Sequence, residues 1–249
     1  MKSFLFMALT LIGCNVTQAQ GNAPQPYAAT YAASFRGIDG GTLRMELRRD
    51  TSPDKYIFET RARPTTLASF FVSRDAFERT HLEFTAEGMR PLHWEADEAK
   101  SGVKNDGKLD FNWQERVATG IYEGQPVSLA LEPGAVELQT IQLAAMLKMQ
   151  GGQEPGTLTV VNGNKLQQYS YARSKAEMLD TKFGKLDTVI YESARAGSNR
   201  VSRIWHAPSL GYMPVRAEQI RKGKIETVLV LVGLEQDGKP LQEAPRERK

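Results

Sequence analysis

The feature that most constrains this chain is the alternation of apolar and polar residues over short segments. The first, YAATYAASF, covers residues 27–35 and places Tyr27, Ala29, Tyr31, Ala33 and Phe35 on one face. A period of two is typical of a half-buried β-strand, because successive side chains of a strand point to opposite sides. The glycine-rich RGIDGG suits a tight connection, and TLRMELRR alternates again. The opening therefore predicts a β-hairpin.

Similar strand-length segments continue along the chain, with turn signals such as SPD, NDG, EGQP, NGN and RKGK between them. They are KYIFETRA, DAFERTHLEF, PLHWEADE, KLDFNW, RVATGIY, PVSLALE, GTLTVV, KLQQYSYA, EMLDT, LDTVIYES, RVSRIWH, MPVRAEQI and KIETVLVLVGL. The last contains TVLVLVGL, which is apolar on both faces. We expect it to be a central strand covered on both sides.

Residues 136–150, VELQTIQLAAMLKMQ, break this pattern and are rich in residues that favour helix. On a helix, the apolar residues of this segment would cover most of the circumference, which is typical of a buried helix. These apolar residues include Leu138, Ile141, Leu143, Ala145, Leu147 and Met149. The most economical position for this helix is inside a curved sheet. We therefore predict a mainly β fold, in which a curved antiparallel meander or half-barrel sheet wraps around one central helix.

The two ends of the chain differ from the region between them. Residues 1–19 carry a lysine followed by an apolar core that is too short to span a membrane, and are predicted to be a secretory signal peptide. Residues 20–26 are expected to form a flexible lead, residues 27–235 a single β-rich domain, and residues 236–249 a disordered tail. No transmembrane span is predicted.

The segment LIGCNVTQAQ, residues 11–20, allows two interpretations of the export signal. In one, Cys14 ends a lipoprotein signal and becomes a lipid anchor. In the other, cleavage follows Ala19 and releases a periplasmic protein, with Thr17 and Ala19 as the small recognition residues. We favour cleavage after Ala19, because the apolar core then stays uninterrupted. Cys14 is the only cysteine, so the folded domain is predicted to hold no disulfide and no thiolate metal site.

The sequence predicts no catalytic residue, no metal site and no cofactor. It has no nucleophile elbow, Walker loop, dinucleotide-binding glycine motif or H-E-x-x-H motif. Its formal net charge is +3 and its basic residues are scattered, which argues against nucleic acid as a partner.

Two of the three histidines could meet across a predicted hairpin. His81 and His93 lie on neighbouring strands, and Glu83 and Glu95 are nearby candidates to complete a metal or general-base site. We favour the simpler interpretation of two half-exposed strand histidines, because no carboxylate or cysteine falls at ligand spacing.

The most distinctive stretch is RIWHAPSLGYMPVR, residues 203–216. Trp205 and His206 point to opposite faces of a predicted strand, and a turn at Gly211 leads into the next strand. Trp205 is favoured as a core anchor over a ligand platform, because burying an indole ring contributes strongly to stability. His206 is the remaining candidate for hydrolase chemistry, but no nucleophile is placed beside it.

The GIDGGT hairpin, the order of strands and helix, and the stretch WHAPSLGYMPVR resemble an exported proteobacterial family of unknown function, DUF3108. The resemblance covers most of residues 27–235 and implies no reaction and no catalytic residues. The final hairpin, with its PVR entry and apolar last strand, is also similar to the LolA and LolB lipoprotein carriers. That second resemblance implies only an architecture, a curved sheet around helices with an apolar cavity.

These features favour a non-enzymatic periplasmic or cell-envelope protein that binds or carries a lipid or other apolar ligand in a concavity of the sheet. The residues expected to contact the ligand are Leu138, Ile141, Trp205 and Tyr212. The alternative is a structural or interaction module with an envelope protein as its partner. A hydrolase is the least favoured function.

Overall fold

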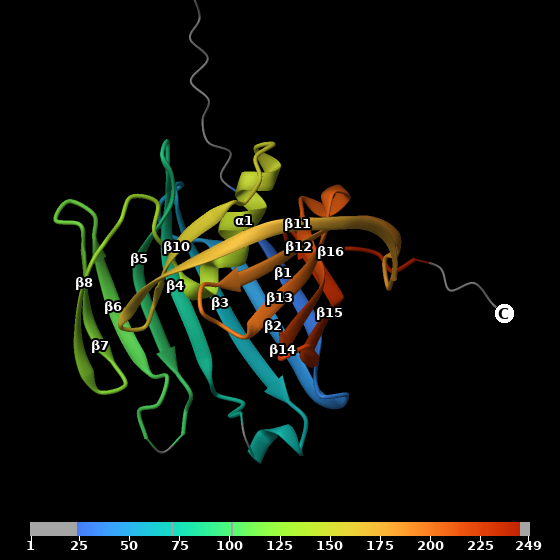
Figure 1. The fold of residues 1–249 in the computed structure, drawn as a ribbon, viewed down its shortest axis with the longest axis horizontal. Helices are drawn as coiled ribbons and strands as arrows, with labels where there is room; N and C mark the ends of the chain where they lie inside the picture. The colour runs from blue at the N-terminus through green and yellow to red at the C-terminus, as the bar shows by residue number, and fades with distance from the viewer. Residues whose placement is uncertain (1–23, 71, 101, 245–249) are drawn as a thin grey trace, which may run out of the picture.

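The computed structural model describes residues 24–70, 72–100 and 102–244. The predicted signal peptide, Cys14 and most of the predicted lead lie outside the described residues. The described chain is mainly β and contains a single α-helix, α1 (Ile141–Gln150), as predicted (Figure 1).

The strands of the first half follow one another as a meander. They are β1 (Tyr27–Phe35), β2 (Ile38–Arg49), β3 (Lys55–Pro64), β4 (Phe77–Thr85), β5 (Gly88–Asp97), β6 (Gly107–Asn112), β7 (Val117–Tyr122) and β8 (Gln125–Ala130). A 3₁₀ segment, η1 (Ala68–Phe70), lies between β3 and β4.

The second half contains the helix and a second meander. Its strands are β9 (Val136–Glu137), β10 (Thr157–Asn162), β11 (Lys165–Thr181), β12 (Gly184–Arg195), β13 (Arg200–Ala207), β14 (Met213–Arg221), β15 (Lys224–Gln236) and β16 (Lys239–Pro240). Two further 3₁₀ segments are η2 (Leu138–Thr140) and η3 (Pro208–Leu210).

All of these strands belong to one curved sheet, in the order β8-β7-β6-β5-β4-β3-β2-β1-β15-β14-β13-β12-β11-β10-β9, with β16 beside β15. Strands β1 and β15 pair antiparallel and so join the two meanders at the centre. The pair β9 and β10 is parallel, and every other pair is antiparallel. The predicted curved antiparallel sheet around one helix is therefore confirmed.

The predicted opening hairpin is formed by β1 and β2, with Phe35 opposite Ile38. Its two turn residues, Arg36 and Gly37, have positive φ values of 50° and 81°, as hairpin turns that match the strand twist require. Gly41, by contrast, lies within β2. Its φ is 105°, and a Cβ there would lie 2.2 Å from the carbonyl oxygen of Arg63.

The helix begins later than residue 136, where the sequence predicted it. Val136 and Glu137 instead form β9, which pairs with Val160 and Val161 of β10. The Glu137 carboxylate then accepts a hydrogen bond of 2.9 Å from the backbone N–H of Gln139, so it caps η2 and turns the chain before α1. Because this side-chain acceptor binds a nearby backbone N–H, the backbone does not need the hydrogen bonds of a helix at this position. Residue composition alone does not reveal this effect.

The main core lies between α1 and the concave face of the sheet. Leu143, Ala145 and Met149 of the helix are buried against aromatic side chains of β3, such as Tyr56 and Phe58. A second core cluster extends the packing through Met146 to β13, β14 and β15. The predicted central helix is buried over most of its circumference, in agreement with its composition.

The beginning of η2 is tied to the opposite half of the sheet by side-chain hydrogen bonds. The Gln139 amide donates to the Thr60 hydroxyl at 2.9 Å and to the backbone carbonyl of Glu78 at 2.8 Å. Thr80 donates to the Glu137 carboxylate at 3.3 Å. We call these bonds the seam, because they bring β9 and η2 against β3 and β4, which lie far away in the strand order.

Three details differ from the predictions. The segments KLQQYSYA and EMLDT are one strand, β11, with a register shift between Arg173 and Ala176. Strand β15 is central, but most of it is not buried; only Leu231 and Leu234 are. Part of the tail predicted to be disordered forms β16, which pairs with the end of β15.

Candidate functional site

A cavity of about 260 Å³ lies between α1 and the concave face of the sheet. Most of its lining side chains are apolar, and they come from β1, β2, β3, α1 and β13 to β15. The apolar members are Tyr27, Tyr31, Met45, Phe58, Leu143, Met146, Ile204, Met213, Pro214, Ala217 and Leu229. The alternation of each strand brings these residues to one face, and the curvature of the sheet directs them toward the helix.

The tyrosines of this cavity contribute rings and no charge. The Tyr31 hydroxyl donates to the carbonyl of Pro214 at 3.0 Å. Burial raises the pKa of Tyr27 and of Tyr31 well above the ordinary value for tyrosine, so both hydroxyls stay neutral. The part of the cavity next to these two tyrosines is therefore suited to an uncharged, apolar group.

Six polar residues also line the cavity, namely Gln139, Gln142, Ser202, Glu218, Gln219 and Thr227. Among these six, Gln142 is the one with a buried side-chain atom that lacks a hydrogen-bond partner within the described residues. Its amide nitrogen donates to the hydroxyl of Tyr171 at 3.1 Å, while its Oε1 is buried and has no hydrogen-bond partner among the described residues. Buried polar atoms are normally paired, so an unpaired acceptor beside a cavity marks a place where a donor from a ligand would be favourable.

A second, polar hollow of about 650 Å³ adjoins the cavity. The two share Gln142, Ser202 and Gln219. The hollow also reaches Asn164 and Ser198, which belong to the turns after β10 and β12. The apolar cavity thus adjoins a polar hollow that extends to the end of the sheet that carries these turns.

The four residues predicted to contact a ligand are divided between different places. Leu138 and Ile141 line the polar hollow rather than the apolar cavity. Trp205 and Tyr212 line neither. Their contact with a ligand stays a prediction, and for Leu138 and Ile141 the structure offers a hollow in which it could occur.

Trp205 is held by contacts unrelated to the cavity. Its indole N–H donates to Glu177 at 2.7 Å, and the Arg216 guanidinium lies 5.5 Å from the centre of its ring. It pairs across the strands with Ile190 and Arg216, on the face opposite to the cavity residue Ile204. Its burial in the second core cluster agrees with the interpretation of Trp205 as a core anchor.

Sequence reasoning did not identify the residues that line the apolar cavity. Tyr27 and Tyr31 were placed together on one face of the first strand, but the same alternation describes any half-buried strand. Leu143 and Met146 were assigned to the buried helix. Only the tertiary structure shows that the helix leaves space beside these residues.

The histidine pair of the predicted hairpin does form. His81 and His93 face each other across β4 and β5, with ring centres 6.0 Å apart. Their carboxylate partners are Asp50, at 3.4 Å from His81, and Asp110, at 2.6 Å from His93. Glu95, a proposed partner, binds Arg79 instead. Within the described residues, no group of three or more His, Cys, Asp or Glu side chains is arranged to hold a metal ion.

His206 is fully buried and its chemistry is constrained. Its Nδ1 lies 2.8 Å from the carbonyl oxygen of Tyr212, so Nδ1 carries the proton. Burial lowers the pKa of His206 to about 4, and the ring is neutral at physiological pH. Its ring lies edge-on to that of Tyr191, with ring centres 6.0 Å apart. These contacts support a structural role in the core.

Two carboxylates, the buried Glu137 and the partly buried Glu78, lie next to the seam. Glu137 is almost completely buried, and both desolvation and the nearby charge of Glu78 raise its pKa well above the ordinary value. Desolvation also raises the pKa of Glu78, which accepts a hydrogen bond of 2.9 Å from the indole N–H of Trp94. Both glutamates line a third hollow of about 310 Å³ beside β4 and β5.

Comparison with known proteins identifies one family. The model of the DUF3108 family, described as a protein of unknown function, matches residues 27–230. No curated protein is significantly similar to the chain. In the described part of the chain, no helix is both long and apolar enough to cross a membrane.

The solved structures that are similar to this chain include two bacterial proteins. One is a protein from Bacteroides fragilis described as exported and as having a YmcC-like fold, with 13% identity, a TM-score of 0.32, and coverage of 86% of this chain and 97% of that one. The other, from Parabacteroides distasonis, is described as a lipoprotein, with 11% identity, a TM-score of 0.34, and coverage of 85% and 96%. Scores this low support no conclusion about this chain.

Proposed function

This chain belongs to the DUF3108 family, and we propose that it is a non-enzymatic envelope protein that binds an amphipathic lipid through its acyl chain. The observation that carries the proposal is the apolar cavity between α1 and the concave face of the sheet. Its volume of about 260 Å³ lies near the lower limit of typical ligand pockets, ~300 Å³, and suits one chain better than a whole phospholipid.

The position of Gln142 supports an amphipathic rather than a purely apolar ligand. This residue lines both the apolar cavity and the polar hollow, and its Oε1 lacks a partner among the described residues. A hydroxyl or protonated carboxyl group at the head of an acyl chain would donate to that oxygen. The chain would then occupy the cavity, where each buried methylene contributes about 0.8 kcal/mol.

The predicted signal peptide supports a periplasmic location for this activity. Both interpretations of residues 11–20 export the protein, and they differ only in whether Cys14 is retained with a lipid or removed. Mass spectrometry of the mature N-terminus distinguishes the two.

Filling the cavity tests the proposal. Ala217 lines it, so Ala217→Phe should place a ring in the acyl-chain space and weaken binding of a fluorescent fatty acid at least tenfold, with a smaller effect on melting temperature. The matched control is Ala32→Phe, because Ala32 pairs with Val230 on the opposite face of the same sheet.

Lipid extraction from protein purified without detergent provides the second measurement. The wild type should yield a bound acyl lipid, and Ala217→Phe should yield much less. Equal binding of the probe by both phenylalanine variants, or an empty wild-type protein that binds no acyl probe, would contradict the proposal.

The alternative function is an interaction module for an envelope protein. One observation favours it: β8 is the last strand on its side of the sheet and, in the described chain, pairs only with β7. An unpaired edge can accept a strand from a partner. A dominant protein partner that is lost on proline substitution in β8, together with an absence of bound lipid, would favour this alternative.

A further inference from the structure

One end of the sheet collects most of the exposed apolar side chains of the described protein. Neighbouring strands are antiparallel, so the connections that follow β1, β3, β5, β7, β10, β12 and β14 lie at the same end, which we call the mouth end. In Figure 1 the mouth end is at the bottom of the view, where the turn of the opening hairpin and η1 are seen. The protruding end of α1 is at the top of the same view.

Eight of the nine exposed large apolar residues in the described chain belong to the mouth end. They are Phe35, Ile38, Leu67, Phe70, Val72, Val103, Ile121 and Ile225, and the ninth is Met178. Scattered single residues of this kind are ordinary on a protein surface, but their concentration at one end marks an interaction site.

Phe35 and Ile38 form the best defined part of this surface. They are directly opposite each other in the register of β1 and β2, and 51% and 57% of their surfaces are exposed. Alternation along β1 places Phe35 on the same face as Tyr31, which lines the apolar cavity. An apolar path therefore runs along one strand from the cavity to the mouth end.

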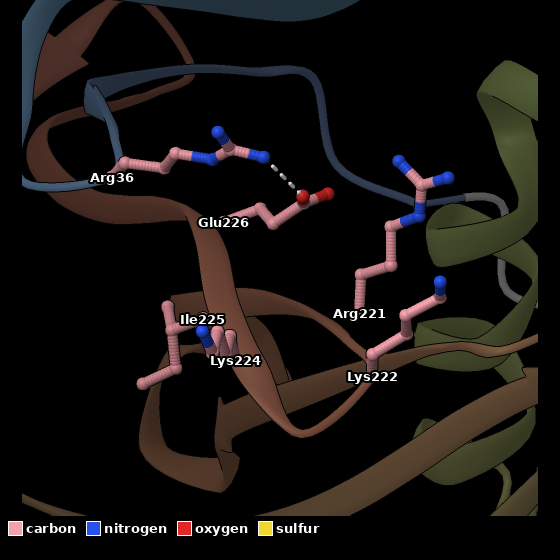
Figure 2. Close-up of a pocket in the computed structure, with 6 residues that line it drawn as sticks. All are labelled: Arg36, Arg221, Lys222, Lys224, Ile225 and Glu226. Atoms are coloured by element: carbon pink, nitrogen blue, oxygen red, sulfur yellow. Dashed lines mark hydrogen bonds and ion pairs between the residues drawn. The ribbon is translucent and has the colours of Figure 1, made fainter.

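Basic side chains lie beside this apolar pair. A surface hollow of about 720 Å³ is lined by Arg36, Arg221, Lys222, Lys224, Ile225 and Glu226, which are drawn in Figure 2. Arg36 binds Glu226 at 2.8 Å and also lies 5.1 Å from the centre of the Phe35 ring. Among the described residues, Arg221, Lys222 and Lys224 make no ion pair. Four basic groups against one carboxylate leave a local charge of +3.

We propose that the mouth end docks on a bilayer containing anionic phospholipid, with Phe35 and Ile38 in the interface and Arg221, Lys222 and Lys224 on the headgroups. Apolar side chains next to unpaired basic groups match the two components of a lipid surface, hydrocarbon and negative charge. Docking in this orientation directs the polar hollow, whose lining includes Asn164 and Ser198, toward the bilayer. The inference goes beyond the proposed function, since the surface could bind a membrane whatever the cavity contains.

Sedimentation with vesicles tests the inference. The purified protein should bind vesicles of mixed phosphatidylcholine and phosphatidylglycerol far more strongly than vesicles of phosphatidylcholine alone, and salt should weaken the binding. The triple variant Arg221→Gln, Lys222→Gln, Lys224→Gln should lower partitioning into the mixed vesicles roughly 100-fold.

The matched control removes three exposed basic groups from the opposite end of the sheet, with Arg48→Gln, Lys185→Gln and Lys239→Gln. It should bind as the wild type does. A second variant and its control test the apolar contribution. The double variant Phe35→Ser, Ile38→Ser should weaken vesicle binding. Met178→Ser should not, because Met178 is 63% exposed but lies outside the mouth end.

The results also distinguish this inference from the proposed function. The docking surface would be overturned if the triple variant at the mouth end and its triple control lost vesicle binding equally. It would also be overturned if the wild type showed no preference for phosphatidylglycerol or bound no vesicles at all. Binding of a fluorescent fatty acid in solution, without vesicles, reports on the cavity alone. The variants at the mouth end should still bind the fluorescent fatty acid. If the wild type does not bind the fatty acid, the cavity proposal is contradicted, while the vesicle result still stands.

Discussion

At the scale of single residues, Glu137 is the least exposed carboxylate in the described chain. Its carboxyl group is buried at the seam, receives hydrogen bonds from Gln139 and Thr80, and lies near the partly buried carboxyl group of Glu78. Sequence gave no reason to single it out, because a Glu before a helix is ordinary on a protein surface. Its environment exists only because β9 meets β4.

The raised pKa of Glu137 predicts a dependence of stability on pH. The native state holds the proton more tightly than the unfolded state, whose glutamate pKa is about 4.3, so this contribution to stability is lost as the pH rises above that value. Glu137→Gln should keep the acceptor and remove the titration. Thermal unfolding between about pH 5 and pH 8 should then show a smaller loss of stability in the variant, by about 1.4 kcal/mol for each unit by which the native pKa is raised.

Two comparisons isolate this effect. The pKa of His206 is lowered to about 4, so its titration makes the native state more stable as the pH rises through that region toward the ordinary histidine value. That effect has the opposite sign and is present in both proteins, so it cancels in the difference. Glu115→Gln, at an exposed turn, is the matched control for the substitution itself. Parallel profiles for the wild type and Glu137→Gln would contradict the assignment.

At the scale of elements, the opening hairpin shows which glycines are required. Gly37 has positive φ in open space, whereas Gly41 combines a φ of 105° with close approach to Arg63. The sequence predicted the hairpin from its alternation and glycines. It did not distinguish the turn glycine from the glycine inside β2, because the contact with Arg63 comes from β3.

Alanine substitutions at Gly37 and Gly41 should separate the cost of a positive φ from the cost of close approach to Arg63. Gly37→Ala should cost about 1–2 kcal/mol of unfolding free energy through positive φ alone. Gly41→Ala should cost more, because its Cβ would also collide with the Arg63 carbonyl at 2.2 Å and force β2 and β3 apart. Denaturant unfolding measures both, and equal losses would show that the close approach is relieved at little cost.

At the scale of the whole molecule, the seam joins two regions that lie far apart in the strand order of the curved sheet. Gln139 donates from η2 to Thr60 of β3 and to the backbone carbonyl of Glu78 in β4. These bonds, with the packing of α1 into the concave face, hold the two meanders around the cavity. The function proposed here depends on that closure, because the cavity has lining residues from both halves.

Removing the Gln139 side chain should loosen this closure. Gln139→Ala leaves the carbonyl of Glu78 without this partner, which should cost about 1–3 kcal/mol. Hydrogen exchange should increase in β9 and β4 more than in the β1 and β15 pair at the centre of the sheet. Gln168→Ala, on an exposed side chain of β11, is the matched control. Uniform exchange changes across the sheet would contradict a local role for the seam.

The sequence by itself determined the strands, the hairpin at the opening, the single buried helix and the mainly β class. These are local properties, since alternation and composition record which face of each segment is buried. Only the tertiary structure decided where the helix begins, which residues line the cavity, and that eight exposed apolar residues share one end. The physical reason is that these features depend on strand order, register and closure, which bring together residues whose separation along the chain carries no signal.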